Sequence, residues 1–241
     1  MGDLREQKKQ NTIECLPKEL LVEIFAKVGT HSIVDLCMVK PCCKKFLDAA
    51  EDDHVYRHAS TENFALMPLP WFTGEKESSF LKRCKESGNS EIAYREGMVQ
   101  CFSSSSSVEL GLQNLKRATM QHHPEAKYGY CMFLMCGEDE GERKEGFDLF
   151  CSLAASTCVE RCRKRVKSFV QSMWVRSIPV LRNHKLSFCC STTCNNETVK
   201  KLSERCRWLE DEDIANIGVS CQGCRADYEV AFFPKIFGVL S

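Results

Sequence analysis

The stretch of residues 16–57 constrains the fold most, because its apolar residues follow the period of short helices that cannot bury their own apolar faces. Pro17 suits the first turn of a helix, where a missing N–H costs nothing. The residues behind it repeat on one helical face: Leu20, Leu21, Ile24, Phe25 and Val28. We therefore predict a first amphipathic helix that starts near Pro17 and ends near Gly29.

Two further helices are expected in the same stretch. Ser32 and Asp35 form a variant of the capping box, which predicts the start of the second helix. Pro41 marks the break before a third segment, in which Phe46 and Leu47 are expected to face inward. Three helices of this length bury little apolar surface, so the sequence indicates that another protein covers what they expose.

The motifs of this stretch resemble the F-box. Counterparts of the family's motifs occur at the family's spacing: Leu16-Pro17, Glu19-Leu20-Leu21, Ile24-Phe25, Asp35-Leu36, Cys43-Lys44-Lys45-Phe46 and Asp52 to Arg57. Pro41 replaces an aliphatic residue of the family pattern, and Phe46 stands where tryptophan is commoner. The alternative is an ordinary three-helix cap that belongs to a larger helical domain.

The resemblance implies a plant-type F-box protein that acts as an adaptor. Residues 12–58 would bind a Skp-family subunit of a cullin-based ubiquitin ligase, and the rest of the chain would hold a protein substrate. Eight residues are implied to share two tasks, packing the helices and filling the partner's groove: Leu16, Pro17, Leu20, Leu21, Ile24, Val28, Leu36 and Phe46. Such an adaptor is not an enzyme, and the sequence contains no phosphate-binding loop, Gly-x-Ser-x-Gly or His-Glu-x-x-His motif.

The balance of charge argues against nucleic acid or a membrane as a partner. Lys plus Arg and Asp plus Glu each number 33 in the 241 residues, so the net charge is zero. The N-terminus lacks an apolar signal segment and no stretch approaches the roughly 20 apolar residues of a membrane helix, so we expect a cytoplasmic or nuclear protein. In that reducing location the 17 cysteines are not a disulfide framework, and most are expected to be small buried hydrophobic residues.

Residues 59–84 are predicted to connect the first region to a helical repeat over residues 85–182. The repeat has an offset of 34 residues and pairs Glu91 with Glu125, Tyr94 with Tyr128 and Met98 with Met132. A second apolar helix pattern follows each copy, an arrangement that is typical of an α-solenoid hairpin and resembles Sel-like or tetratricopeptide repeats. The alternative is an irregular helical bundle with chance periodicity.

The last region, residues 183–241, has a different character. Cys221 and Cys224 have the spacing of a zinc knuckle, and Gly223 between them is free to take the positive φ that a knuckle favours. Apolar and polar residues alternate from Tyr228 onward. This alternation predicts a short strand after the cysteine pair, in the layout of a zinc ribbon.

The other half of the candidate metal site is less determined. The predicted zinc ligands are Cys190, Cys194, Cys221 and Cys224. Cys189 with Cys194 has a less favourable spacing, and His184 or Cys206 could replace one ligand. The alternatives to structural zinc are buried reduced cysteines and a redox dithiol, the latter disfavoured because no clear helix pattern follows Cys224.

Together these patterns predict a mainly α chain. A three-helix F-box would be followed by solenoid-like helical hairpins and a small Cys-rich segment with a short β element. The predicted function is that of a ubiquitin-ligase adaptor. Two other classes of function stay open: a helical-repeat protein-binding scaffold with structural zinc and no ligase role, and a zinc-dependent or thiol enzyme built on the C-terminal cysteines.

Overall fold

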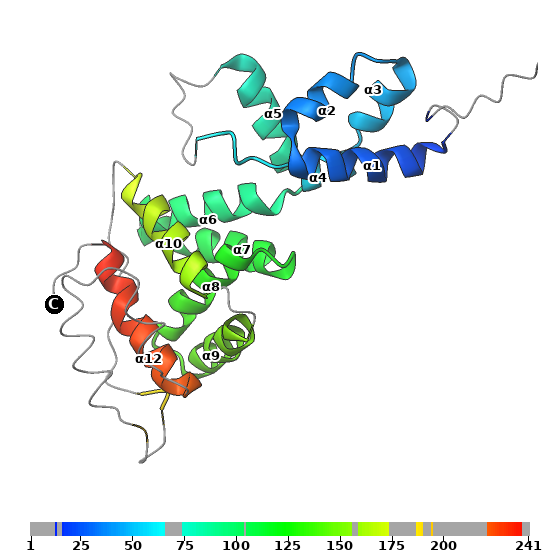
Figure 1. Cartoon of the computed structure of the whole chain (residues 1–241). Helices are drawn as coiled ribbons and strands as arrows, with labels where there is room; N and C mark the ends of the chain where they lie inside the picture. The colour runs from blue at the N-terminus through cyan, green and yellow to red at the C-terminus, as the bar shows by residue number, and fades with distance from the viewer. Residues whose placement is uncertain are drawn as a thin grey trace, which may run out of the picture. The chain divides into compact units, whose positions relative to one another are not determined.

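The structure is a computed structural model that describes residues 13, 16–65, 74–103, 105–155, 159–173, 187–189, 194 and 221–237. It consists of two compact units, residues 1–92 and 93–241, which we describe separately. Every regular element in the described residues is a helix (Figure 1). The mainly α prediction is therefore confirmed, and the predicted β element is wrong. None of the described helices combines the length and the apolar character that a membrane crossing requires.

The first unit contains four helices in the region where three were expected. They are α1 (Lys18–His31), α2 (Ile33–Val39), α3 (Lys44–Ala50) and α4 (Asp53–His58), and α5 (Glu75–Glu86) follows them. The predicted start of the second helix is confirmed, because the Ser32 Oγ accepts a hydrogen bond from the Asp35 N–H at 3.1 Å. The Ser32 N–H donates to the Val28 carbonyl at 2.8 Å, so the cap is made by the Ser32 side chain alone. The fourth helix starts at a cap of the same kind, where Asp52 accepts from the His54 N–H at 3.0 Å.

The core of the first unit is small and centred on α1. Leu21, Leu36 and Val55, from α1, α2 and α4, are completely buried in it. The rings of Phe25 and Phe46 meet edge to face at 5.3 Å, which fixes α3 against α1. Since α1 contacts each of the next three helices, it is the element around which the unit is built.

Helix α5 joins this unit through aromatic contacts. The ring of Phe80 lies 5.6 Å from that of Tyr56 on α4 and stacks on Phe64 at 5.3 Å. Most of α5 falls within residues 59–84, which the sequence predicted as a connector. That stretch therefore contributes apolar surface to the N-terminal core.

The second unit is a succession of antiparallel helices. They are α6 (Ser90–Ser103), the 3₁₀ turn η2 (Ser105–Ser107), α7 (Val108–Met120), α8 (Pro124–Met135), α9 (Glu140–Ala154), α10 (Val159–Gln171), α12 (Gln222–Phe232) and η5 (Phe233–Phe237). Helix α8 begins 34 residues after α6, and α10 begins 35 residues after α8. The predicted 34-residue repeat is confirmed, and α10 supplies a third copy.

Equivalent turns open the first two copies. Gly88 and His122, 34 residues apart, adopt φ values of +80° and +62°, which ends the preceding helix in a left-handed turn. The side chains of Asn89 and His123 come next, and each accepts a hydrogen bond from the backbone N–H three residues later, at 3.3 and 3.1 Å. An asparagine and a histidine thus make the same helix cap, so the two copies share this geometry without sharing the residue.

Close contacts at glycines bring neighbouring helices together. A Cβ added to Gly111 of α7 would lie 2.6 Å from the Sγ of Cys101 on α6, and one added to Gly146 of α9 would lie 2.9 Å from the Cβ of Leu134 on α8. Real Cβ atoms do not approach that closely, so only glycine permits these helix pairs to pack at this distance.

Helix α12 fastens to the repeats through a buried polar cluster. Glu229 of α12 accepts hydrogen bonds from the guanidinium of Arg163 on α10, at 3.1 Å from Nε and also from Nη2, and from the Tyr128 hydroxyl on α8 at 2.8 Å. All three side chains are buried. Burial, followed by the adjacent Glu229 carboxylate, raises the pKa of Tyr128 well above its usual range.

The strand predicted after Cys224 is wrong because the segment forms α12. Cys224, Tyr228 and Phe232 recur every four residues, pack together, and place two rings in a parallel stack 6.1 Å apart. A segment of 11 residues can satisfy a period of two and a period of 3.6 at once. Packing against α8 and α9 selects the helix.

We expect Glu229→Gln to destabilise the second unit by about 3–5 kcal/mol, because it leaves the buried Arg163 without its counter-charge. Urea unfolding of the full-length protein, followed by circular dichroism, measures the loss. The matched control is Glu160→Gln on α10, whose ion pair with Lys164 is exposed, and which should change the free energy of unfolding by less than about 0.5 kcal/mol. Equal effects of the two variants would contradict the role assigned to Glu229.

Candidate protein-interaction face

Large exposed apolar side chains lie mainly in the first unit. Among the described residues, five are exposed there and two in the second unit. Those on the helices are Leu20 at 51%, Val34 at 62%, Met38 at 67% and Leu47 at 43% exposure, which we call the exposed apolar set. Apolar exposure concentrated on one small region is typical of a protein-binding surface.

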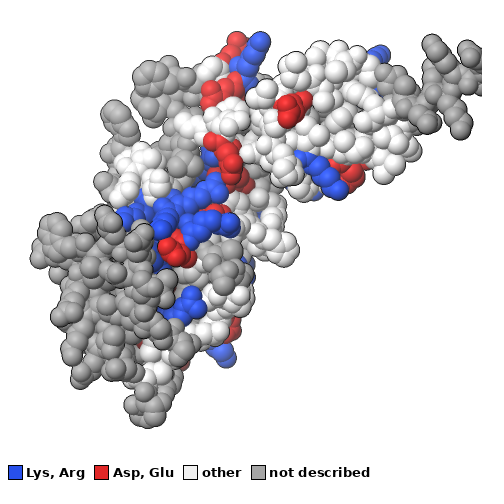
Figure 2. All heavy atoms as spheres, viewed as in Figure 1, with Lys and Arg blue, Asp and Glu red and all other residues white. Residues whose placement is uncertain are grey.

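Three consecutive helices carry this set. Val34 and Met38 are four residues apart on α2, so they lie on the same side of that helix. Leu20 is near the start of α1 and Leu47 is on α3, and the two helices are joined where the Lys45 ammonium donates to the Leu16 carbonyl at 2.8 Å. Over the face of the first unit drawn in Figure 2, charged side chains are scattered among neutral ones.

The structure separates the eight residues predicted to contact a Skp-type partner. Leu21 and Leu36 are completely buried in the core. Four others are partly buried and pack against that core: Leu16, Ile24, Val28 and Phe46. Pro17 and Leu20 are exposed. The eight residues therefore differ in burial, and their contact with a Skp-type partner stays a prediction.

Sequence reasoning missed Val34 and Met38 and placed Leu47 inward. Helix α2 reads Ile-Val-Asp-Leu-Cys-Met-Val and is apolar on nearly all sides, although only Ile33 and Leu36 are buried. An apolar residue on the outward side of so short a helix was the signal that could have identified this surface.

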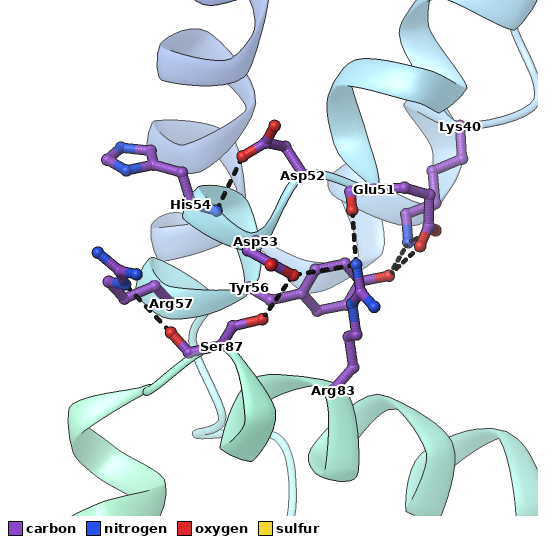
Figure 3. Close-up of polar contacts among 9 residues, drawn as sticks. All are labelled: Lys40, Glu51, Asp52, Asp53, His54, Tyr56, Arg57, Arg83 and Ser87. Carbon is purple, nitrogen blue, oxygen red and sulfur yellow. Dashed lines mark hydrogen bonds and ion pairs between the residues drawn. The ribbon is translucent and has the colours of Figure 1, made fainter.

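A polar network fixes α5 against α3 and α4. Figure 3 shows its nine residues: Lys40, Glu51, Asp52, Asp53, His54, Tyr56, Arg57, Arg83 and Ser87. The Arg83 guanidinium donates to the Glu51 carbonyl at 3.2 Å and pairs with the Asp53 carboxylate at 3.0 Å. The Ser87 hydroxyl donates to the same carboxylate at 3.2 Å.

At one end of the network a lysine, a glutamate and a tyrosine meet. The Lys40 Nζ lies 2.6 Å from Glu51 and 2.9 Å from the Tyr56 hydroxyl, which donates to Glu51 at 2.7 Å. Burial alone would raise the pKa of Glu51, but the hydrogen bonds from Lys40 and Tyr56 lower it below 4.5. Burial would lower the pKa of Lys40, but the bonds to Glu51 and Tyr56 raise it above 10.5.

In the second unit four thiols converge, three of them among the four that the sequence predicted. The Sγ atoms of Cys189, Cys194, Cys221 and Cys224, which we call the cysteine cluster, lie within 4.8 Å of one another. Cys189 therefore takes the position expected for Cys190, which lies outside the described residues, as do His184 and Cys206.

The Cys221 and Cys224 half of this cluster lies at the start of a helix, not in the turn of a zinc ribbon. Cys221 is the N-cap residue and Cys224 lies in the first helical turn, so a helix does follow the pair. The expected positive φ of Gly223 is also wrong, because among the described glycines only Gly88 has one. The hydrogen bond from the Cys224 backbone N–H lowers the pKa of the Cys221 thiol to about 7, whereas burial raises the pKa of Cys224.

Comparison with known families and proteins gives matches to both units. The family model described as F-box-like matches residues 13–62, and plant tetratrico peptide repeats match residues 64–171. F-box protein At2g35280 of Arabidopsis thaliana is 30% identical over 134 residues, which cover 56% of this chain and 78% of that protein. The chain belongs to the F-box protein family.

A second relative matches a longer part of this chain. The putative F-box protein At1g67623 of Arabidopsis thaliana is 25% identical over 220 residues, which are 87% of this chain and 72% of the relative. No solved structure matches the chain. The F-box-like match covers α1 to α4 and the repeat match covers α5 to α10, so the network of Figure 3 joins the F-box to α5, a helix within the region of the repeat match.

The network gives this F-box protein a defined pH dependence. The lowered pKa of Glu51 means that its stabilisation is complete above about pH 4.5 and is lost as the pH falls through the folded-state pKa. The raised pKa of Lys40 means that its stabilisation is complete below about pH 10.5 and is lost as the pH rises further.

We therefore expect Glu51→Gln to flatten the loss of stability on the acid side. The reduction near neutral pH should be at most about 1 kcal/mol, because the Glu51 side chain is 45% exposed to water. Urea unfolding across the acid range measures both quantities. Glu62→Gln, at an exposed position outside the network, is the control. If both variants lose unfolding free energy at low pH to the same extent, Glu51 is not the source of the pH dependence.

Proposed function

We propose that this F-box protein is the substrate-recognition subunit of a Skp-cullin-F-box ubiquitin ligase. The first unit binds a Skp-family adaptor, which links it to the cullin, and the second unit binds a protein substrate. In this role the protein catalyses no step. It holds the substrate in the complex while other subunits transfer ubiquitin.

The exposed apolar set is the observation that carries the proposal. Fully burying a leucine, valine or methionine side chain contributes about 1.5–3 kcal/mol relative to leaving it exposed. About half of each of the four side chains is still in contact with water, so an apolar partner groove gains roughly 1 kcal/mol from each of them. The family match over residues 13–62 supports a Skp-type protein as that partner.

The burial of each leucine indicates whether it can contact a partner directly or only stabilises the fold. Leu21 and Leu36 have no exposed surface, so they contribute to binding only by holding the helices in place. Leu20 is next to Leu21 in sequence yet is half exposed, so a partner can contact it directly. A change at Leu21 should therefore lower the stability of the fold, whereas a change at Leu20 should lower the affinity for the partner.

The second unit supports a role in substrate binding. Stacked helical hairpins offer extended surfaces that bind protein segments. Leu110 and Met120 of α7 are exposed apolar side chains on this unit. They provide matched controls for the exposed apolar set, since their exposures of 51% and 74% resemble those of Leu20 and Met38.

We expect the double change Leu20→Asp and Met38→Asp to weaken binding to a purified Skp-family protein by at least about 100-fold, because it places two charges in an apolar interface. Isothermal titration calorimetry with the full-length protein measures the affinity. Circular dichroism should stay unchanged, since both positions are exposed in the free protein.

The control is the double change Leu110→Asp and Met120→Asp, which should leave Skp binding as it is in the wild type. If the wild type does not bind a Skp-family protein, the scaffold function without a ligase role replaces the proposal. If both double variants lose binding equally, the exposed apolar set is not the contact surface.

A further inference from the structure

The cysteine cluster has the dimensions of a metal site. Its members come from two segments that are far apart in sequence, and the Sγ atoms of Cys189 and Cys221 are 3.7 Å apart. A disulfide requires about 2.05 Å between sulfurs, and all four cysteines are free. Zinc–thiolate bonds of about 2.3 Å in a tetrahedron place the sulfurs about 3.8 Å apart, which agrees with the observed separation.

Other groups hold the ligands in position. The Asp227 carboxylate, one turn after Cys224, accepts hydrogen bonds from the Phe188 N–H at 2.7 Å and the Cys189 N–H at 3.3 Å. It also accepts a hydrogen bond from the Ser187 hydroxyl. A metal site whose ligands are oriented by neighbouring hydrogen bonds is already organised before the ion binds.

Gly223 permits the approach of the two segments. A Cβ at this position would lie 2.8 Å from the Phe188 carbonyl oxygen and 2.9 Å from the Cα of Cys189. Any side chain there would push Cys189 away from the N-terminus of α12. The glycine that the sequence suggested for a positive φ is therefore required for close packing.

We propose that the cysteine cluster binds one structural zinc ion. Four thiolate ligands complete the tetrahedron and leave no position for water or substrate, so the site is structural and not catalytic. A redox dithiol would need only Cys221 and Cys224, and would not account for the convergence of Cys189 and Cys194 on the same point.

The ion connects the C-terminal region to the repeats. Phe188, next to the ligand Cys189, stacks on Phe147 of α9 at 5.2 Å and lies 5.1 Å from the Arg143 guanidinium. On the other side of the site, α12 carries Glu229, which pairs with Arg163 of α10. Zinc therefore joins two segments that each contact a different helix of the repeats. It also cross-links Cys194 to Cys221, so the residues between them form a closed loop in sequence.

Metal analysis of the full-length protein, purified without chelators, tests the proposal. We expect about one zinc per chain in the wild type, and loss of the metal in Cys221→Ser and in Cys189→Ser. Cys190→Ser and Cys151→Ser, the latter at a half-buried cysteine on α9, should retain it. If Cys190→Ser loses zinc while Cys189→Ser keeps it, the ligand assignment is wrong.

A second measurement uses the wild type alone, in case the variants fail to fold. Protein stripped of metal and titrated with Co²⁺ should develop the visible absorption of a tetrahedral thiolate complex with an endpoint of one ion per chain. Wild-type protein that carries no zinc and shows no such absorption would overturn the proposal, and the thiols would then be packed without an ion.

The zinc site and the Skp-binding face can fail independently. None of the four ligands lies in the first unit, so Cys221→Ser should bind a Skp-family protein as the wild type does. Loss of zinc without loss of Skp binding is the expected combination.

Discussion

The shortage of apolar surface in the F-box helices is the constraint on which the first unit depends. Helices α1 to α4 are between 6 and 14 residues long, and only their innermost side chains, such as Leu21 and Val55, are fully covered. The unit gains further burial from α5, which packs Phe80 against Tyr56 and is held by Arg83. The F-box and α5 thus form one compact unit, which supports the face that a partner would cover.

The second unit meets a different constraint, because a short array of helical hairpins has an open end. Repeats bury their apolar faces against neighbours, and the last one needs a cap. Helix α12 supplies it with a mostly apolar side and one buried charge, Glu229. That carboxylate is tolerated in the core because Arg163 and Tyr128 both donate to it. The cysteine cluster lies at the N-terminus of α12 and packs against the same helix there.

Much of the fold could be predicted because it rests on local periodicity. The helix cap at Ser32, the apolar face of α1 and the 34-residue offset between Tyr94 and Tyr128 depend on contacts that recur at fixed separations in the chain. The third repeat copy could not be seen in this way. Helix α10 keeps the glutamate at the second position of the repeat helix, Glu160, but has Arg163 where the other two copies have Tyr94 and Tyr128.

What the sequence by itself determined is the class of each part: amphipathic helices with an F-box pattern, a helical repeat, and a cysteine-rich end. The tertiary structure decided which side chain does what. Leu20 is exposed and Leu21 is buried because the other helices cover only one side of α1. Residues after Cys224 form a helix that packs against α8 and α9, and its four-residue stripe lies against the cysteine cluster. Cys189 joins the cluster because Asp227 and the bare backbone of Gly223 hold it there, and no spacing along the chain encodes that contact.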